Sequence, residues 1–259
     1  MVSREELIGE VEPAVCRIVA LDASANEIGW GSGFLTDHGL ITAHHVLPTE
    51  TYDTAKIEFG GGLNLVLARA DVQSRTSHES LESAWDYRLI SVEGLEIPSQ
   101  HIHIVPSPLP PRGREVLYLG YPFGTTTLTA SVGYVSAVET DSIDLIRIDG
   151  SVNRGNSGGP VIDLTSRSLI GVIIRAETGY LEQQFDQLHT ALIANIKALE
   201  SQQGGARIVI GGLDPVDAIR ASQAALLQLA EAIRKLMSES ATRLHFAILL
   251  SISNDYGHF

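Results

Sequence analysis

A serine lies in a glycine-rich segment of the sequence, Gly155-Asn156-Ser157-Gly158-Gly159-Pro160. Glycine tolerates tight turns and leaves backbone N–H groups unhindered, so such a turn can hold N–H donors beside the serine hydroxyl. These donors would stabilise the oxyanion that forms when the hydroxyl attacks a carbonyl carbon. The segment alone is equally typical of an ordinary turn. Interpreting it as a nucleophile requires a base elsewhere in the chain.

Two other stretches supply the groups that a serine nucleophile needs. His44 and His45 follow a strand predicted over residues 39–42, and Asp86 enters an apolar strand predicted over residues 85–92. An imidazole can take the proton of a serine hydroxyl and return it to the leaving group. A buried carboxylate needs hydrogen-bond donors to stay charged, and a histidine ring can be one. Together the three residue types predict acyl transfer.

Short strands joined by turns are expected to position these residues, which predicts an all-β fold. A capping box formed by Ser3 and Glu6 predicts a helix over residues 4–11, and a polar connection is predicted over residues 74–83. A second helix is predicted over residues 193–201. The other predicted strands cover residues 14–21, 56–59, 63–72, 116–119, 128–138, 142–149, 160–163, 168–175 and 189–192.

Composition narrows the classes of partner. The 259 residues carry a formal net charge of −13, which repels phosphate backbones and anionic membranes, so neither nucleic acid nor a membrane is expected as a partner. Cys16 is the only cysteine and is expected to be a buried thiol. No cluster of Cys and His has metal-ligand spacing, so neither a metal nor another cofactor is expected. Residues 1–12 lack an apolar core, which predicts a cytoplasmic protein.

The order His45, Asp86, Ser157 resembles the trypsin-like serine peptidases, and the surrounding motifs are most similar to the bacterial HtrA-type branch. The resemblance covers about residues 12 to 200 and implies two six-stranded antiparallel β-barrels with the triad in the cleft between them. The matching motifs, in order, are Gly31-Ser32-Gly33-Phe34, Thr42-Ala43-His44-His45-Val46, Asp86 to Ile90, Gly120-Tyr121-Pro122-Phe123-Gly124 and Gly155 to Pro160.

The resemblance also implies a role for each matching residue. His45 would be the general base, because the family motif is Thr-Ala-any-His, and Asp86 would orient its ring. Ser157 would be the nucleophile. The oxyanion hole would be formed by Gly155, Asn156 and Ser157, with the N–H groups of Gly155 and Ser157 as the donors.

Three positions depart from patterns common among trypsin-like peptidases. Arg88 stands where a small residue is usual, and Arg154 stands where the HtrA branch usually has proline. Asn156 replaces the aspartate that pairs with a newly cut N-terminus in digestive trypsins. Activation by that ion pair is therefore excluded.

Alignment with the family also predicts the specificity pocket. Ser151 would lie at its base, so no buried charge selects Lys or Arg. The uncharged base predicts a small or apolar P1 residue. Arg154 at the rim and Arg175 on the strand edge that pairs with substrate would favour a carboxylate, which predicts an acidic side chain nearby in the substrate. The other residues predicted to bind substrate are Ile174, Ala176 and His189.

The remainder of the chain is predicted as a separate extension over residues 204–259, after a peptidase domain over residues 1–203. A strand over residues 207–211, a helix that begins at Asp214-Pro215 and a strand over residues 244–252 are expected. The extension is too short for the PDZ module that commonly follows HtrA-type peptidases. Such a small unit must pack on the peptidase or pair with another chain, so residues 214–253 are a candidate surface for self-association or a partner protein.

The sequence therefore predicts a serine endopeptidase that cleaves a peptide or protein substrate through an acyl-enzyme. Two alternatives stay open. One is a catalytically silent scaffold that keeps the fold as a peptide-binding module. The other is a regulated effector protease that is controlled through its C-terminal extension.

Overall fold

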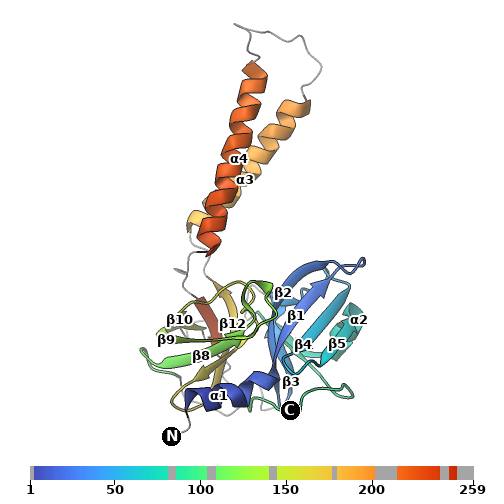
Figure 1. Cartoon of the computed structure of the whole chain (residues 1–259), viewed down its shortest axis with the longest axis vertical. Helices are drawn as coiled ribbons and strands as arrows, with labels where there is room; N and C mark the ends of the chain where they lie inside the picture. Colours follow the sequence, from blue (N-terminus) through green and yellow to red (C-terminus); the bar gives the residue numbers. More distant parts are fainter. Residues whose placement is uncertain are drawn as a thin grey trace. The chain divides into compact units, whose positions relative to one another are not determined.

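The computed structural model describes residues 3–80, 86–103, 109–139, 145–176, 180–201, 215–239 and 245–249 (Figure 1). The chain forms two compact units. The first, the β unit, combines Met1–Glu177 with Leu244–Phe259, and the second, the helical unit, is Thr178–Arg243. The predicted boundary between residues 203 and 204 lies inside the helical unit. None of the helices in these described ranges is both long and apolar enough to cross a membrane.

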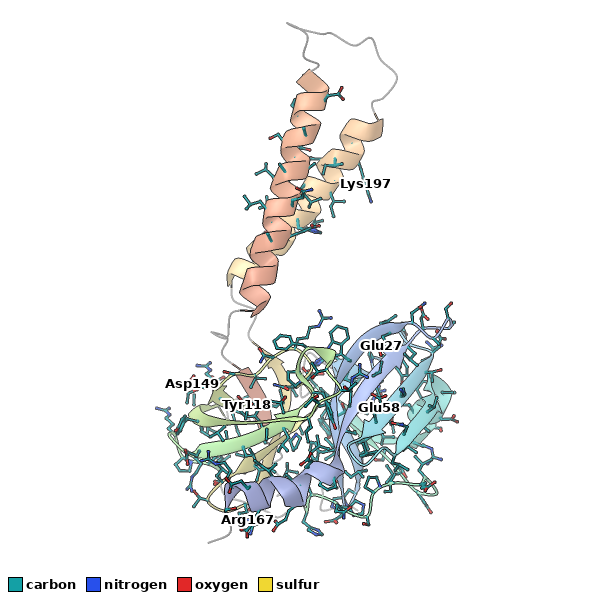
Figure 2. The ribbon with its side chains drawn as sticks, in the orientation of Figure 1. Glu27, Glu58, Tyr118, Asp149, Arg167 and Lys197 are labelled. Carbon is teal, nitrogen blue, oxygen red and sulfur yellow. The ribbon has the colours of Figure 1, made fainter. Side chains whose placement is uncertain are left out.

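An antiparallel seven-stranded sheet forms the N-terminal half of the β unit, with the strand order β5-β4-β1-β2-β3-β7-β6. The strands are β1 (Val15–Leu21), β2 (Glu27–Thr36), β3 (Gly39–Ala43), β4 (Thr54–Phe59), β5 (Asn64–Ala68), β6 (Thr76–Ser80) and β7 (Tyr87–Ile90). Cross-strand ion pairs contribute to its outer face, where Arg17 of β1 lies 2.7 Å from Glu58 and 3.4 Å from Glu27 (both glutamates are labelled in Figure 2).

Two short helices, α1 (Arg4–Val11) and η1 (Glu12–Ala14), precede β1. Two more connect strands: η2 (His44–Val46) follows β3, and α2 (Arg69–Arg75) follows β5. The predicted capping box is present, because Ser3 Oγ accepts from the N–H of Glu6 and Glu6 Oε2 accepts from the N–H of Ser3. Leu7 and Val11 of α1 are buried in the core. The apolar face of α1 therefore anchors the start of the chain.

A closed six-stranded barrel forms the C-terminal half, with the strand order β10-β13-β12-β11-β8-β9. Its elements are β8 (Glu115–Gly120), η3 (Pro122–Gly124), β9 (Thr129–Glu139), β10 (Leu145–Asp149), β11 (Pro160–Asp163), β12 (Leu169–Ala176) and β13 (His245–Leu249). The prediction of a double all-β architecture is confirmed, with seven strands rather than six in the first half.

Alternation along β8 shows how the two halves share one core. Val116 and Tyr118 pack inside the C-terminal barrel, whereas Leu117 and Leu119 join the cluster that also contains the buried residues of the N-terminal sheet. Successive side chains of a strand point to opposite faces, so one strand can serve both cores. A continuous apolar layer therefore joins the two halves.

The helical unit contains α3 (Tyr180–Ser201) and α4 (Pro215–Glu239), which lie side by side (orange and red in Figure 1). The predicted start of α4 is confirmed to within a residue. The predicted closing strand over residues 189–192 is wrong, because these residues lie within α3. The strand that completes the barrel is β13, which pairs with both β10 and β12. The predicted strand over residues 207–211 lies outside the described residues.

Two smaller predictions also need correction. The strand predicted over residues 63–72 ends at Ala68, and α2 begins at Arg69. The segment predicted as a polar connection over residues 74–83 contains β6, which pairs with β7. Pairing with β7 explains how so polar a segment forms a strand, because the backbone hydrogen bonds come from a neighbour that the local pattern does not reveal.

Candidate active site

His45 lies on η2, the single turn that follows β3, and it is fixed by Asp86. Its backbone N–H donates to Asp86 Oδ1 at 3.0 Å, and its ring Nδ1 lies 2.7 Å from Asp86 Oδ2. Because an ionised carboxylate can only accept, Nδ1 carries the proton and Nε2 is left with a free lone pair. The side chain of His45 is 32% exposed, so the ring is partly open to solvent.

Asp86 is fully buried immediately before β7, with a left-handed φ of +47°. Aspartate tolerates this conformation better than most residues. Its backbone carbonyl accepts from the N–H of His44 at 3.1 Å, so main chain and side chain both hold the histidine turn. The burial that the sequence predicted for this carboxylate is confirmed.

Beside this pair lies a polar cluster, buried at Arg88 and His44, that the sequence did not predict. Arg88 is 1% exposed, and its Nη2 donates to Glu79 at 2.5 Å and to Thr49 at 3.2 Å. His44 is also buried, with Nε2 3.6 Å from the same Glu79 carboxylate. Burial and the charge of Arg88 lower the pKa of His44, so its ring stays neutral near neutral pH. Arg88 therefore ties β7 to β6 and to the loop after His45.

Ser157 lies in the turn between β10 and β11, and Gly158 brings this turn against the N-terminal sheet. Gly158 has φ +86°, and a Cβ on it would lie 2.0 Å from the carbonyl oxygen of Ser32 and 2.9 Å from the nitrogen of Ala43. Only glycine permits so close an approach. Ala43 directly precedes the histidine turn, so this contact brings the serine turn next to the turn that carries His45.

Ser157 and His45 are not hydrogen-bonded to each other. Ser157 Oγ lies 3.5 Å from the carbonyl oxygen of Ile174, and within the described part of the chain it makes no hydrogen bond to His45. Such contacts are often long in free enzymes and tighten when substrate binds.

Backbone hydrogen bonds set the direction of two N–H groups in the turn. The carbonyl of Arg154 accepts from Phe123 at 2.7 Å, and the carbonyl of Asn156 accepts from Gly159 at 2.9 Å. In a trans peptide the following N–H points opposite to the carbonyl. The N–H groups of Gly155 and Ser157 therefore point away from Phe123 and Gly159.

Asn156 differs from the other two residues predicted for the oxyanion hole. Its backbone N–H donates to the carbonyl of Asn153 at 3.0 Å, so it supplies no free donor.

Ser32, for which the sequence predicted no separate role, holds the serine turn by hydrogen bonds from the N-terminal sheet. Its buried hydroxyl donates to the carbonyl of Gly155 and accepts from the N–H of Tyr121. The only signal in the sequence was its place in the glycine motif at residues 31–34.

Strand β12 runs past the end of β11 beside Ser157. On one edge, β12 pairs with β11 as far as Val172, and Ile173 is hydrogen-bonded to the backbone of Gly158 and Gly159. On the other edge, pairing with β13 continues to Ala176. On the β11 side, the described residues leave positions 174–176 without a strand partner. This open edge fits the predicted contact of Ile174, Arg175 and Ala176 with an extended peptide.

The other residues predicted to bind substrate are distributed differently. Ser151 is exposed and its neighbour Val152 is buried. Arg154 is exposed, and its guanidinium carbon lies 5.0 Å from the centre of the Trp30 ring. His189 lies in α3, 3.7 Å from Glu231 of α4, so the strand on which its predicted role rested is absent. No group of three or more potential metal ligands is found among the described residues.

Comparison with known proteins gives consistent matches. The family model described as a trypsin-like peptidase domain matches residues 31–172. Two curated relatives are named as probable periplasmic DegP-like serine endoproteases. The one from Bartonella henselae is 32% identical over 152 residues, which are 56% of this chain and 27% of that protein. The one from Rickettsia conorii is 28% identical over 162 residues, 59% of this chain and 29% of that protein. The chain thus spans less than a third of each relative.

Among solved structures, the HtrA-type protease AlgW with a tripeptide matches with a TM-score of 0.53 and 22% identity. The match covers 66% of this chain and 54% of that one, and it supports the fold. The names of the curated relatives contradict the predicted cytoplasmic location, since they point to the periplasm. The single buried Cys16 cannot discriminate, because it forms no intramolecular disulfide in either compartment.

Proposed function

Because the chain belongs to the trypsin-like peptidase family, we propose that it is a serine endopeptidase whose catalytic triad is His45, Asp86 and Ser157. The observation that carries this proposal is the pair of hydrogen bonds from His45 to the two oxygens of the buried Asp86 carboxylate. They leave Nε2 as the one ring atom able to accept a proton, on a ring that is partly exposed.

In the proposed reaction, Ser157 Oγ attacks the scissile carbonyl carbon while His45 Nε2 takes its proton. Asp86 keeps the tautomer and stabilises the imidazolium without taking the proton itself. The N–H groups of Gly155 and Ser157 donate to the oxyanion, each contributing about 3 kcal/mol. The imidazolium then protonates the leaving amine, and the resulting acyl-enzyme is hydrolysed by water with His45 as the base again.

An extended peptide would add to β12 beyond Ile173, where positions 174–176 have an open edge. Main-chain hydrogen bonds there would hold the peptide in register with Ser157. This arrangement supports cleavage within a chain rather than removal of a terminal residue, because main-chain pairing of this kind requires no free terminus in the substrate.

The test is covalent labelling by a fluorophosphonate together with turnover of a peptide library. Wild type should be labelled stoichiometrically, and Ser157→Ala should lose labelling and lose turnover by about 10³-fold or more with an unchanged melting temperature. Ser24→Ala, an exposed serine in the β1–β2 turn, serves as the matched control. Labelling of Ser157→Ala equal to that of wild type refutes the assignment. An unlabelled, folded wild type would favour the peptide-binding scaffold.

A further inference from the structure

Arg154 is an exposed cation in the same turn as Ser157. Although the chain has far more acids than bases, Arg154 forms no ion pair with any described residue. Arginines of the β unit that do contact an acidic side chain are Arg4, Arg17, Arg88, Arg114, Arg147 and Arg167. The guanidinium of Arg154 lies over the ring of Trp30 instead. A guanidinium held by its face keeps its N–H edge available for an anion.

The ring beneath this cation is held firmly. A Cβ on Gly124 would lie 2.9 Å from the Trp30 ring, and a Cβ on Gly155 would lie 3.2 Å from it. Both glycines have a positive φ, so their backbones close on the ring from the η3 turn and from the serine turn. Trp30 Nε1 is buried and has no hydrogen-bond partner among the described residues. The Trp30 ring thus holds the Arg154 guanidinium next to Gly155.

Phe123 lies beside the same turn and is unusually exposed. Its side chain is 55% exposed, and its φ is +57°, a conformation that is costly for a bulky residue. Its N–H donates to the carbonyl of Arg154, which couples the two backbones. Residues held in such conformations concentrate at ligand-binding and active sites. An apolar ring here would also lower the local dielectric around a bound ion pair.

We propose that Arg154, Trp30 and Phe123 form a subsite that binds an Asp or Glu side chain of the substrate close to the scissile bond. This proposal rests on the proposed peptidase function. The protein as a whole carries −13 and repels acidic peptides, so a preference for them has to arise locally, at an unpaired cation. Charge-assisted hydrogen bonds from the guanidinium edge to the carboxylate give the selectivity.

The experiment uses peptide pairs that differ only by Glu or Gln at each position within three residues of the cleavage site. For wild type, kcat/KM should favour Glu by about three- to tenfold at one position, and 0.5 M salt should reduce this ratio. Arg154→Gln should bring the ratio to about one, and Arg154→Lys should restore part of it, because lysine keeps the charge but not the planar fork.

Arg112→Gln is the matched control, since Arg112 is exposed and precedes β8 at the end opposite Phe123. It removes the same charge and should leave the Glu/Gln ratio unchanged. The proposal is overturned if wild type shows no preference, if Arg154→Gln keeps it, or if Arg112→Gln abolishes it equally. Titrating the same peptides into Ser157→Ala by fluorescence anisotropy tests the subsite without turnover. Failure of the peptidase proposal is seen separately, as absence of labelling and of cleavage of every peptide.

Discussion

The two halves of the β unit are assembled differently. All seven strands of the N-terminal sheet come from residues 15–80 and 87–90, so its chain is nearly continuous. The C-terminal barrel takes five strands from residues 115–176 and its sixth, β13, from residues 245–249, after the helical unit. The sheet that carries His45 and Asp86 is therefore formed by neighbouring segments of the chain. The barrel that carries Ser157 is closed by a strand that follows the helical unit in the sequence.

The two halves also hold their site residues by different physical means. His45 is fixed by hydrogen bonds to a buried carboxylate, with the Arg88–Glu79 pair beside it. Ser157 is fixed by the close approach of Gly158 to Ser32 and Ala43. We therefore expect the N-terminal half to be most sensitive to substitutions that change charge. The C-terminal half should be most sensitive to larger side chains in the serine turn and to loss of β13.

The largest effect is expected from removing β13. A chain that ends at residue 243 leaves β10 and β12 with unpaired edges where the barrel was closed. We expect a loss of several kcal/mol of unfolding free energy, a large part of the about 5–15 kcal/mol that a domain has, and loss of fluorophosphonate labelling. Urea unfolding followed by tryptophan fluorescence, together with labelling, measures both.

A second variant separates the strand from the helices. Ala176 of β12 lies directly opposite His245 of β13, so a short glycine-containing turn can replace residues 178–243. This variant should keep the barrel and the labelling. If it behaves like the truncated chain, then the helical unit, rather than β13, supports the serine side, and the comparison of the two halves fails.

The next effect is expected from Gly158→Ala. The new Cβ would meet the Ser32 carbonyl at 2.0 Å and would adopt φ +86°, so the turn must move. We expect a loss of about 3 kcal/mol or more in stability and about 100-fold or more in kcat/KM, measured by urea unfolding and peptide cleavage.

Gly113→Ala is the matched control for this change. Gly113 has φ +81° but no atom within 4 Å of its Cβ position, so only the backbone cost of about 1 kcal/mol applies, with cleavage unchanged. Equal losses for both variants would show that backbone strain, not the close approach, governs the serine turn.

The motifs that predict the triad are local in sequence, whereas several elements around it depend on distant contacts. Five motifs in one order predict His45, Asp86 and Ser157 as partners, and the structure shows the hydrogen bonds between His45 and Asp86. The segment 189–192 was misassigned because four residues cannot distinguish a strand from one turn of an amphipathic helix. The register of β13 with β10 and β12 depends on contacts between residues about 70 to 100 positions apart, which local alternation does not encode.

Arg88 illustrates a different reason why sequence was insufficient. It was recognised as a departure from the family, yet its burial depends on Glu79 from a segment too polar to predict as a strand. A buried arginine is tolerated only when a carboxylate from elsewhere in the fold reaches it. Neither residue alone signals the pair.

The smallest effect concerns pH and tests the charge sensitivity of the N-terminal half. Burial and the charge of Arg88 lower the pKa of His44 below its usual value near 6.5, whereas Glu79 and Asp86 act in the opposite sense. As pH falls from about 7 through this range, the unfolded chain takes up a proton that folded His44 resists, so stability is lost. Urea unfolding of His44→Asn between pH 7 and 5 should therefore show a shallower loss of unfolding free energy than wild type.

Glu79→Gln should make this loss steeper, because it removes a charge that favours protonated His44. Equal slopes for wild type and His44→Asn would remove His44 from the pH response. A steeper loss in His44→Asn would mean that its ion pair with Glu79 outweighs burial and Arg88.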